Sequence, residues 1–180
     1  MKKILQAREK ILRQTAKEVP LSDIAKPKIK KVLKEMSQAL KGQSDGVALA
    51  APQIGYSLRI FVVSGKIFEK DFLDKHGREV PKKVLKKLKD LVFINPKISK
   101  LSKEKTWVPE GCLSVRWLYG KTHRAKKATV VAYDEKGKKF TRGASGLLAQ
   151  IFQHETDHLE GILFIDHAKE IKEELPDEKK

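Results

Sequence analysis

The sequence predicts an α+β fold in a single domain of 180 residues. Three features indicate this class: an amphipathic helix near the N-terminus, apolar runs with strand composition in the middle, and a second helix near the C-terminus. Helices and strands do not alternate as they do in βαβ folds. We therefore expect antiparallel sheets packed around the second, central helix.

The first helix is expected over residues 27–41, where apolar residues recur at helical spacing: Ile29, Val32, Leu33, Met36 and Leu40. Residues 59–64 and 91–98 have the apolar, β-branched composition of strands. A hairpin is expected with strands at 128–133 and 138–142, because a polar turn that ends in glycine separates them. These segments supply the predicted sheets.

The second helix is expected from residue 145 to residue 160. Ser145 is a suitable N-cap, and Gly161 is suited to end the helix. One helical stripe holds, at spacings of four, three and four residues, Leu147, Ile151, His154 and His158. The two histidines thus continue an apolar row that we expect to face inward.

This stripe contains an H-E-x-x-H pattern, in which Glu155 follows His154 and His158 ends the motif. Residues four apart share a helix face, so the two imidazoles can bind one metal ion, and Glu155 can move a proton of water on that ion. The alternative is a pair of core histidines bonded to backbone carbonyls. A buried imidazole needs a polar partner, whether a metal ion or a carbonyl. The H-E-x-x-H spacing favours a metal ion as that partner.

A catalytic zinc-type site usually has three protein ligands and one open position for water. Phe164 stands where metzincins have their third histidine, which excludes that family. The single cysteine, Cys112, lies among turn-forming residues and is the favoured third ligand. An isolated cysteine can also be a core residue or a nucleophile. A ligand from the C-terminal segment remains open: Glu170, Glu173 or Glu174.

Three segments together make the chain resemble the peptide deformylases. Residues 46–55, G-V-A-L-A-A-P-Q-I-G, are similar to the family signature G-x-G-L-A-A-x-Q. Residues 110–114 match E-G-C-L-S, and residues 153–159 match Q-H-E-x-D-H-L. The segments occur in the family's order, and the resemblance covers about residues 4–168.

The resemblance implies that Cys112, His154 and His158 hold one divalent metal ion. The implied metal in the cell is Fe²⁺, with Zn²⁺, Ni²⁺ or Co²⁺ as substitutes. Glu155 is the implied general base and acid. The implied reaction hydrolyses the N-formyl group of the formylmethionine that begins a nascent polypeptide, and releases formate.

The resemblance also implies that Gln53, through its side-chain amide, and Leu113, through its backbone N–H, bind the oxyanion. The positions that we expect to border the substrate are Gly46, Ala48, Glu110 and Gly111. Amide hydrolysis requires a nucleophilic oxygen, oxyanion stabilisation and a proton for the leaving amine. The residues that match the family supply all three requirements.

Metal-bound histidines usually donate their second N–H to a carboxylate, a carbonyl or water. Glu110 and Asp157 are the nearest carboxylates in the sequence, and Arg124 is a candidate partner of Asp157. The alternative is that each of these charges is a solvated surface group.

The chain departs from the family pattern in three places. Ala48 replaces the second glycine of the first signature, and an added methyl group can narrow a substrate groove. Arg116 stands where the family often has proline. Residues 65–90 form a lysine-rich stretch that is longer than expected. These departures concern the substrate range and not the reaction.

The formal net charge is +16, from 32 lysines and only 7 arginines against 23 acidic residues. Proteins that read bases rely on arginine, so we expect no sequence-specific nucleic acid partner. The lysine excess leaves two interpretations: a solvated surface, or attraction to ribosomal RNA near emerging chains. No segment predicts a membrane span or an export signal, and the lone cysteine fits a reducing compartment, so we expect a cytoplasmic protein.

We expect a catalytic domain over residues 1–168 and a polar tail over 169–180 that frays. Two other functions stay open beside deformylation. One is an H-E-x-x-H metalloprotease that uses a glutamate of the tail as its third ligand. The other is a non-catalytic, basic ribosome-binding homologue, which requires that the matched site residues are inert.

Overall fold

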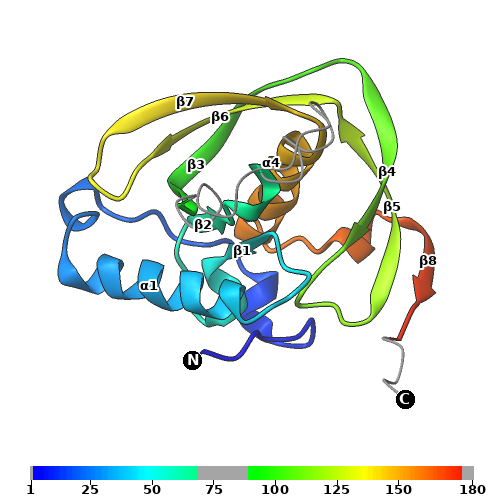
Figure 1. Cartoon of the computed structure of the whole chain (residues 1–180), viewed down its shortest axis with the longest axis horizontal. Helices are drawn as coiled ribbons and strands as arrows, with labels where there is room; N and C mark the ends of the chain where they lie inside the picture. The colour runs from blue at the N-terminus through cyan, green and yellow to red at the C-terminus, as the bar shows by residue number, and fades with distance from the viewer. Residues whose placement is uncertain (1, 69–88, 176–180) are drawn as a thin grey trace, which may run out of the picture.

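The computed structural model describes residues 2–68 and 89–175, and Figure 1 shows their arrangement. The helices and strands, with 3₁₀-helices labelled η, are η1 (Lys10–Arg13), η2 (Leu21–Asp23), α1 (Pro27–Lys41), β1 (Ala48–Ala50), η3 (Ala51–Ile54), β2 (Ile60–Val63), β3 (Leu91–Leu101), β4 (Lys105–Gly111), β5 (Leu118–Ala125), β6 (Lys127–Tyr133), β7 (Lys139–Ser145), α4 (Gly146–Leu159), η4 (Phe164–Asp166) and β8 (Lys169–Glu173). None of the helices described is long and apolar enough to cross a membrane.

The described strands form two antiparallel sheets. The larger sheet has the order β1-β2-β3-β6-β7, and the smaller one has the order β4-β5-β8. Helix α4 lies between the two sheets, whereas α1 lies outside the larger sheet near β1 and β2 (Figure 1). The predicted α+β class and the central position of the second helix are confirmed.

Strand β2 is apolar at every position because both of its faces are covered. Ile60 and Val62 pack in the cluster that contains the buried face of α1. Phe61 and Val63 belong instead to the cluster around α4, where Phe61 lies 4.5 Å from Phe93 between ring centroids. Successive strand residues point to opposite faces, so this run of apolar residues joins the two halves of the core.

Helix α4 begins and ends where the sequence predicts. Ser145 is its N-cap residue, although its side chain makes no capping hydrogen bond. Gly161 follows the last turn with φ +74°. The predicted inward row needs one correction, because Leu147 is 36% exposed, whereas Ile151 and His158 are buried. The start of the row therefore faces a pocket and not the core.

The sequence missed three strands and misjudged the C-terminus. Strands β1, β4 and β5 were not predicted, and β4 carries a proline, which is tolerated because β4 is an edge strand. The expectation that residues 169–180 fray is wrong for Lys169–Glu173, which pairs with β5 as β8. Exposed side chains concealed this strand, since a strand can be held by backbone hydrogen bonds alone. Most of the stretch 65–90 and residues 176–180 lie outside the described residues.

We predict that Gly161→Ala destabilises the protein by about 2–4 kcal/mol. Gly161 has positive φ, and a Cβ built there lies 2.7 Å from the carbonyl carbon of Arg13. Urea unfolding measures the loss. The matched control is Gly143→Ala in β7, where the nearest atom, Thr129 Oγ1, is 3.7 Å away; equal loss in both variants contradicts the prediction.

Candidate metal centre and active site

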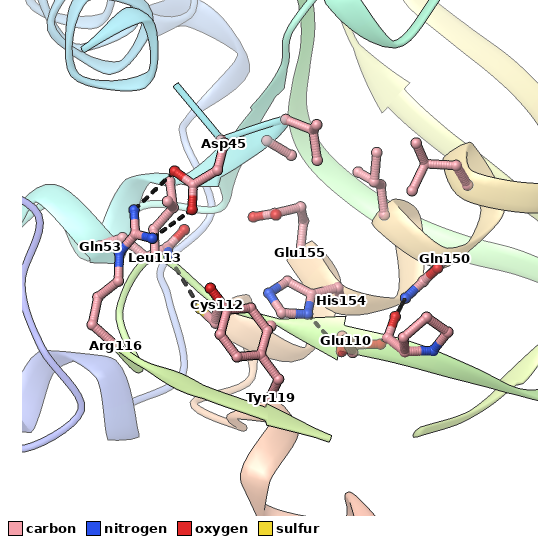
Figure 2. Close-up of a pocket in the computed structure, with 17 residues that line it drawn as sticks. Asp45, Gln53, Glu110, Cys112, Leu113, Arg116, Tyr119, Gln150, His154 and Glu155 are labelled. Atoms are coloured by element: carbon pink, nitrogen blue, oxygen red, sulfur yellow. Dashed lines mark hydrogen bonds and ion pairs between the residues drawn. The ribbon is translucent and has the colours of Figure 1, made fainter. Parts of the chain in front are cut away.

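A cavity of about 300 Å³ lies where the two sheets meet α4 (Figure 2). One wall is the segment before and within β1, the second wall is the end of β4 with the turn that follows it, and the floor is α4. The cavity is lined by Asp45, Gly46, Val47, Ala48, Gln53, Pro109, Glu110, Gly111, Cys112, Leu113, Arg116, Tyr119, Leu147, Gln150, Ile151, His154 and Glu155. All the substrate-bordering positions expected from the sequence therefore lie together.

Three possible metal ligands form a cluster, and two of them, Cys112 and His154, line this cavity. Cys112, His154 and His158 place their ligand atoms within 4.8 Å of one another. Cys112 Sγ lies 3.2 Å from His158 Nε2. Ligand atoms on one tetrahedral ion with bonds of about 2.0–2.3 Å lie roughly 3–4 Å apart. One thiolate and two imidazoles at these distances fit a divalent metal ion.

Two separate elements position this triad. His154 and His158 lie one turn apart on α4, with ring planes at 82° and centroids 4.8 Å apart. Cys112 follows the last residue of β4, at the start of a turn in which Ser114 N–H donates to Cys112 Sγ at 3.4 Å. The site therefore forms only when the smaller sheet packs against α4.

A buried carboxylate fixes the orientation of His154. Glu110 Oε1 accepts a hydrogen bond from His154 Nδ1 at 2.6 Å, which leaves Nε2 for a metal. Glu110 also pairs with Arg124 at 2.7 Å, and Arg124 reaches Asp157 at 2.7 Å. Burial opposes the charge of Glu110, but hydrogen bonds from His154 and Arg124 outweigh it and hold the pKa of Glu110 well below its usual range. The pairs Glu110–His154 and Arg124–Asp157, which the sequence suggests, are present. Asp157 does not orient the other histidine, because His158 Nδ1 has no hydrogen-bond partner among the described residues.

Burial and the neighbouring His154 lower the pKa of His158 well below its usual range, so the imidazole is neutral. The neutral ring is the form that binds metal ions.

Gln53 turns its amide NH₂ toward the site for a local reason. Its Oε1 accepts the backbone N–H of Ala50 at 2.7 Å, so the NH₂ group must point the other way. It lies 3.1 Å from Ser114 Oγ and 3.6 Å from Cys112 Sγ. The short helix η3 thus delivers a side-chain donor beside the thiol.

Glu155 is 3% exposed, and its Oε2 has no hydrogen-bond partner among the described residues. Burial raises the pKa of Glu155 to about 7. A buried carboxylate oxygen without a partner costs free energy, and such a group in a cavity is a candidate for a functional role. The backbone N–H of Leu113 is similarly unused in the hydrogen bonds of the described residues.

The glutamates of the C-terminal segment do not join the triad. Glu170 pairs with Lys121 on the exposed side of the smaller sheet, and the metal-binding cluster found in the described residues uses Cys112. Sequence reasoning missed Gln150 and Asp45 as cavity residues. Gln150 lies one helical turn before His154, a spacing that could have identified it.

A family model described as "Polypeptide deformylase" matches residues 1–174. The chain belongs to the peptide deformylase family. A peptide deformylase of Fusobacterium nucleatum is 39% identical over 173 residues, which cover 96% of this chain and 87% of that protein. The family is metal-dependent and removes the N-formyl group from the formylmethionine of new polypeptides, with release of formate, and this is the reaction of the present enzyme.

Solved deformylase structures share the fold. The structure of a peptide deformylase from Legionella pneumophila has a TM-score of 0.76 at 34% identity, covering 94% of this chain and 87% of that chain. A second structure, of a peptide deformylase from Synechococcus elongatus in complex with actinonin, has a TM-score of 0.74 at 31% identity. The match covers 93% of this chain and 79% of that chain. The metalloprotease and the non-catalytic alternatives are not favoured.

We predict that Glu110→Gln lowers metal affinity about 10- to 100-fold, because His154 loses its charged hydrogen-bond partner. Competition with a chelator measures the affinity. Glu104→Gln is the control, since Glu104 is exposed and its carboxylate pairs with Lys126, where both residues lie in connections between strands. Equal affinity of the Glu110 variant and the wild type would show that this carboxylate does not support the metal site.

Proposed function

We propose that this enzyme deformylates peptides in the cavity that Cys112 and His154 border, with Fe²⁺ held in the cell by these two residues and by His158, which is buried behind them. The observation that carries the proposal is the unpartnered carboxylate oxygen of Glu155 beside three converging ligand atoms. When bound, such an ion acidifies water and polarises a carbonyl. Thiolate and imidazole ligands suit Fe²⁺, and they also suit Zn²⁺, Ni²⁺ and Co²⁺.

Glu155 is the proposed general base and acid. It takes one proton from the water that attacks the formyl carbon, and it delivers that proton to the leaving amide nitrogen. The C–N bond breaks, the peptide keeps a free amine, and the formyl carbon leaves as formate. Its raised pKa of about 7 suits a group that accepts and releases a proton near neutral pH.

Gln53 and Leu113 are the proposed oxyanion donors. The Gln53 NH₂ points into the cavity because its oxygen is held by Ala50. The unused N–H of Leu113 lies one residue after Cys112. Two donors held in place before the reaction stabilise the charge that develops on the formyl oxygen, and loss of one typically costs about 10²–10³ in rate.

The peptide is proposed to bind along β1. This strand is one edge of the larger sheet, and Gly46 and Ala48 border the cavity there. An extended peptide can add a strand to such an edge. Val47 and Leu147 are each 36% exposed at the cavity, and their apolar surfaces suit the side chain of methionine. On the opposite wall Gly111 has no room for a side chain, because Tyr119 lies over it.

We predict that the metal-loaded wild type releases formate from formyl-Met-Ala-Ser, whereas Glu155→Gln loses about 10²–10⁴ in kcat with its metal retained. Formate is measured with an enzyme-coupled assay, and metal content by atomic absorption. Gln150→Ala is the control, because Gln150 lines the same cavity but its amide does not take up or release a proton near neutral pH. Full activity in the Glu155 variant refutes its role, and no formate from the wild type with any of the four metals refutes the proposed reaction at this site.

We propose that the enzyme works in the cytoplasm on nascent formylmethionyl chains and that its lysine-rich surface attracts it to ribosomal RNA. The charge of +16 supports this attraction. The predicted result is co-sedimentation with ribosomes at about 50 mM KCl that is lost by about 200 mM. Co-sedimentation no better than that of an albumin control contradicts it.

A further inference from the structure

Two charged residues face each other across the mouth of the cavity. Asp45 lies on the wall that leads into β1, and Arg116 lies in the turn that follows Cys112 on the other wall (Figure 2). Neither residue is part of the proposed chemistry. Both line the cavity, so their contact connects two walls that are distant in the sequence.

The contact has the geometry of a strong ion pair. Arg116 donates to both carboxylate oxygens of Asp45, at 2.5 and 3.1 Å, and to Gln43 Oε1 at 3.1 Å. The guanidinium also lies 4.5 Å from the ring centroid of Trp117. The hydrogen bond from Arg116 holds the pKa of Asp45 below its usual range. Most exposed ion pairs contribute little, but Arg116 is only 19% exposed and makes a two-point, stacked contact.

Hydrogen bonds connect the turn that carries Arg116 to Cys112 and Leu113. Val115 N–H donates to Cys112 O at 3.0 Å, and Leu118 N–H donates to Val115 O at 3.1 Å. Gln6 holds the same turn from outside, because it donates to Leu113 O at 3.1 Å and accepts Arg116 N–H at 3.4 Å. A shift of Arg116 therefore moves a turn that has little internal freedom.

The two walls lie close together beside this ion pair, with no room for a further side chain between them. A Cβ built on Gly46, next to Asp45, lies 3.1 Å from Leu113 Cδ1. At this end the walls are thus close on the inside, and the Arg116–Asp45 ion pair joins them.

We propose that the Arg116–Asp45 ion pair is a latch that holds the two walls of the substrate cavity at the spacing that the peptide requires. Arg116 and Asp45 are positioning residues for substrate binding, and they do not touch the reacting atoms. The inference rests on the proposed use of this cavity as the peptide site. Without the latch, only a fraction of molecules has the competent spacing, and the apparent affinity falls by that fraction.

The test measures steady-state kinetics and peptide affinity of the metal-loaded enzyme. Arg116→Ala and Asp45→Asn are each expected to raise KM for formyl-Met-Ala-Ser roughly five- to tenfold, with kcat within about twofold of the wild type. The double variant is expected to match the single ones, because removal of either partner already opens the latch. Arg116→Lys keeps the charge without the two-point contact, so its KM is expected to lie between that of the wild type and that of Arg116→Ala.

Arg13→Ala is the matched control. Arg13 pairs with Asp166 at 2.5 Å, away from the cavity lining, so its loss is expected to leave KM unchanged. Thermal unfolding of each variant reports any general loss of structure, and Asp45→Asn preserves the size and shape of the side chain. Unchanged KM in the two single variants, or additive effects in the double variant, overturns the latch.

Binding without turnover separates this inference from the reaction itself. Calorimetry in a Glu155→Gln background measures the Kd of the same peptide, with and without Arg116→Ala. An active wild type whose Kd does not depend on Arg116 overturns the latch alone. Weaker binding on loss of Arg116 supports the latch even if the wild type releases no formate. The absence of formate would overturn only the proposed reaction.

Discussion

The buried carboxylate of Glu110 is the constraint on which the rest of the site depends. It lies on β4, accepts hydrogen bonds from Thr122 and Arg124 on β5, and accepts the N–H of His154 on α4. Cys112 follows it by two residues. One side chain thus joins the smaller sheet to the helix, orients one candidate metal ligand and lies two residues before another. Glu110 is 6% exposed, and its carboxylate stays charged because these donors replace the hydrogen bonds to water that burial removes.

The active site is a junction between two sheets rather than a feature of one. The larger sheet contributes the edge strand β1 and, through η3, the side chain of Gln53. The smaller sheet contributes the turn that carries Cys112 and Leu113, and α4 lies between the two sheets with its histidines and Glu155 (Figures 1 and 2). Each wall is tied down by polar contacts outside the reacting centre. Preorganisation of this kind would let the proposed oxyanion donors act without reorganising during the reaction.

Patterns with a strong physical period allowed much of this arrangement to be predicted. Helix α1 was found at its observed bounds because its apolar face repeats every three or four residues, and α4 because a stop glycine and the H-E-x-x-H spacing agree. Strands β4 and β8 were missed because a proline and a run of exposed side chains hide their pairing. The Asp45–Arg116 contact spans 71 residues, and no local pattern encodes such a distance.

X-ray absorption spectroscopy of the zinc-loaded wild type tests whether Cys112, His154 and His158 bind the metal. Ligation by Cys112, His154 and His158 gives one sulfur at about 2.3 Å and two imidazole nitrogens at about 2.0–2.1 Å, with one light-atom position left for water or substrate. Loss of the sulfur shell in Cys112→Ser completes the assignment. A wild-type spectrum with no sulfur shell, or with a protein carboxylate in its place, would contradict ligation by Cys112. The third ligand would then come from another part of the chain.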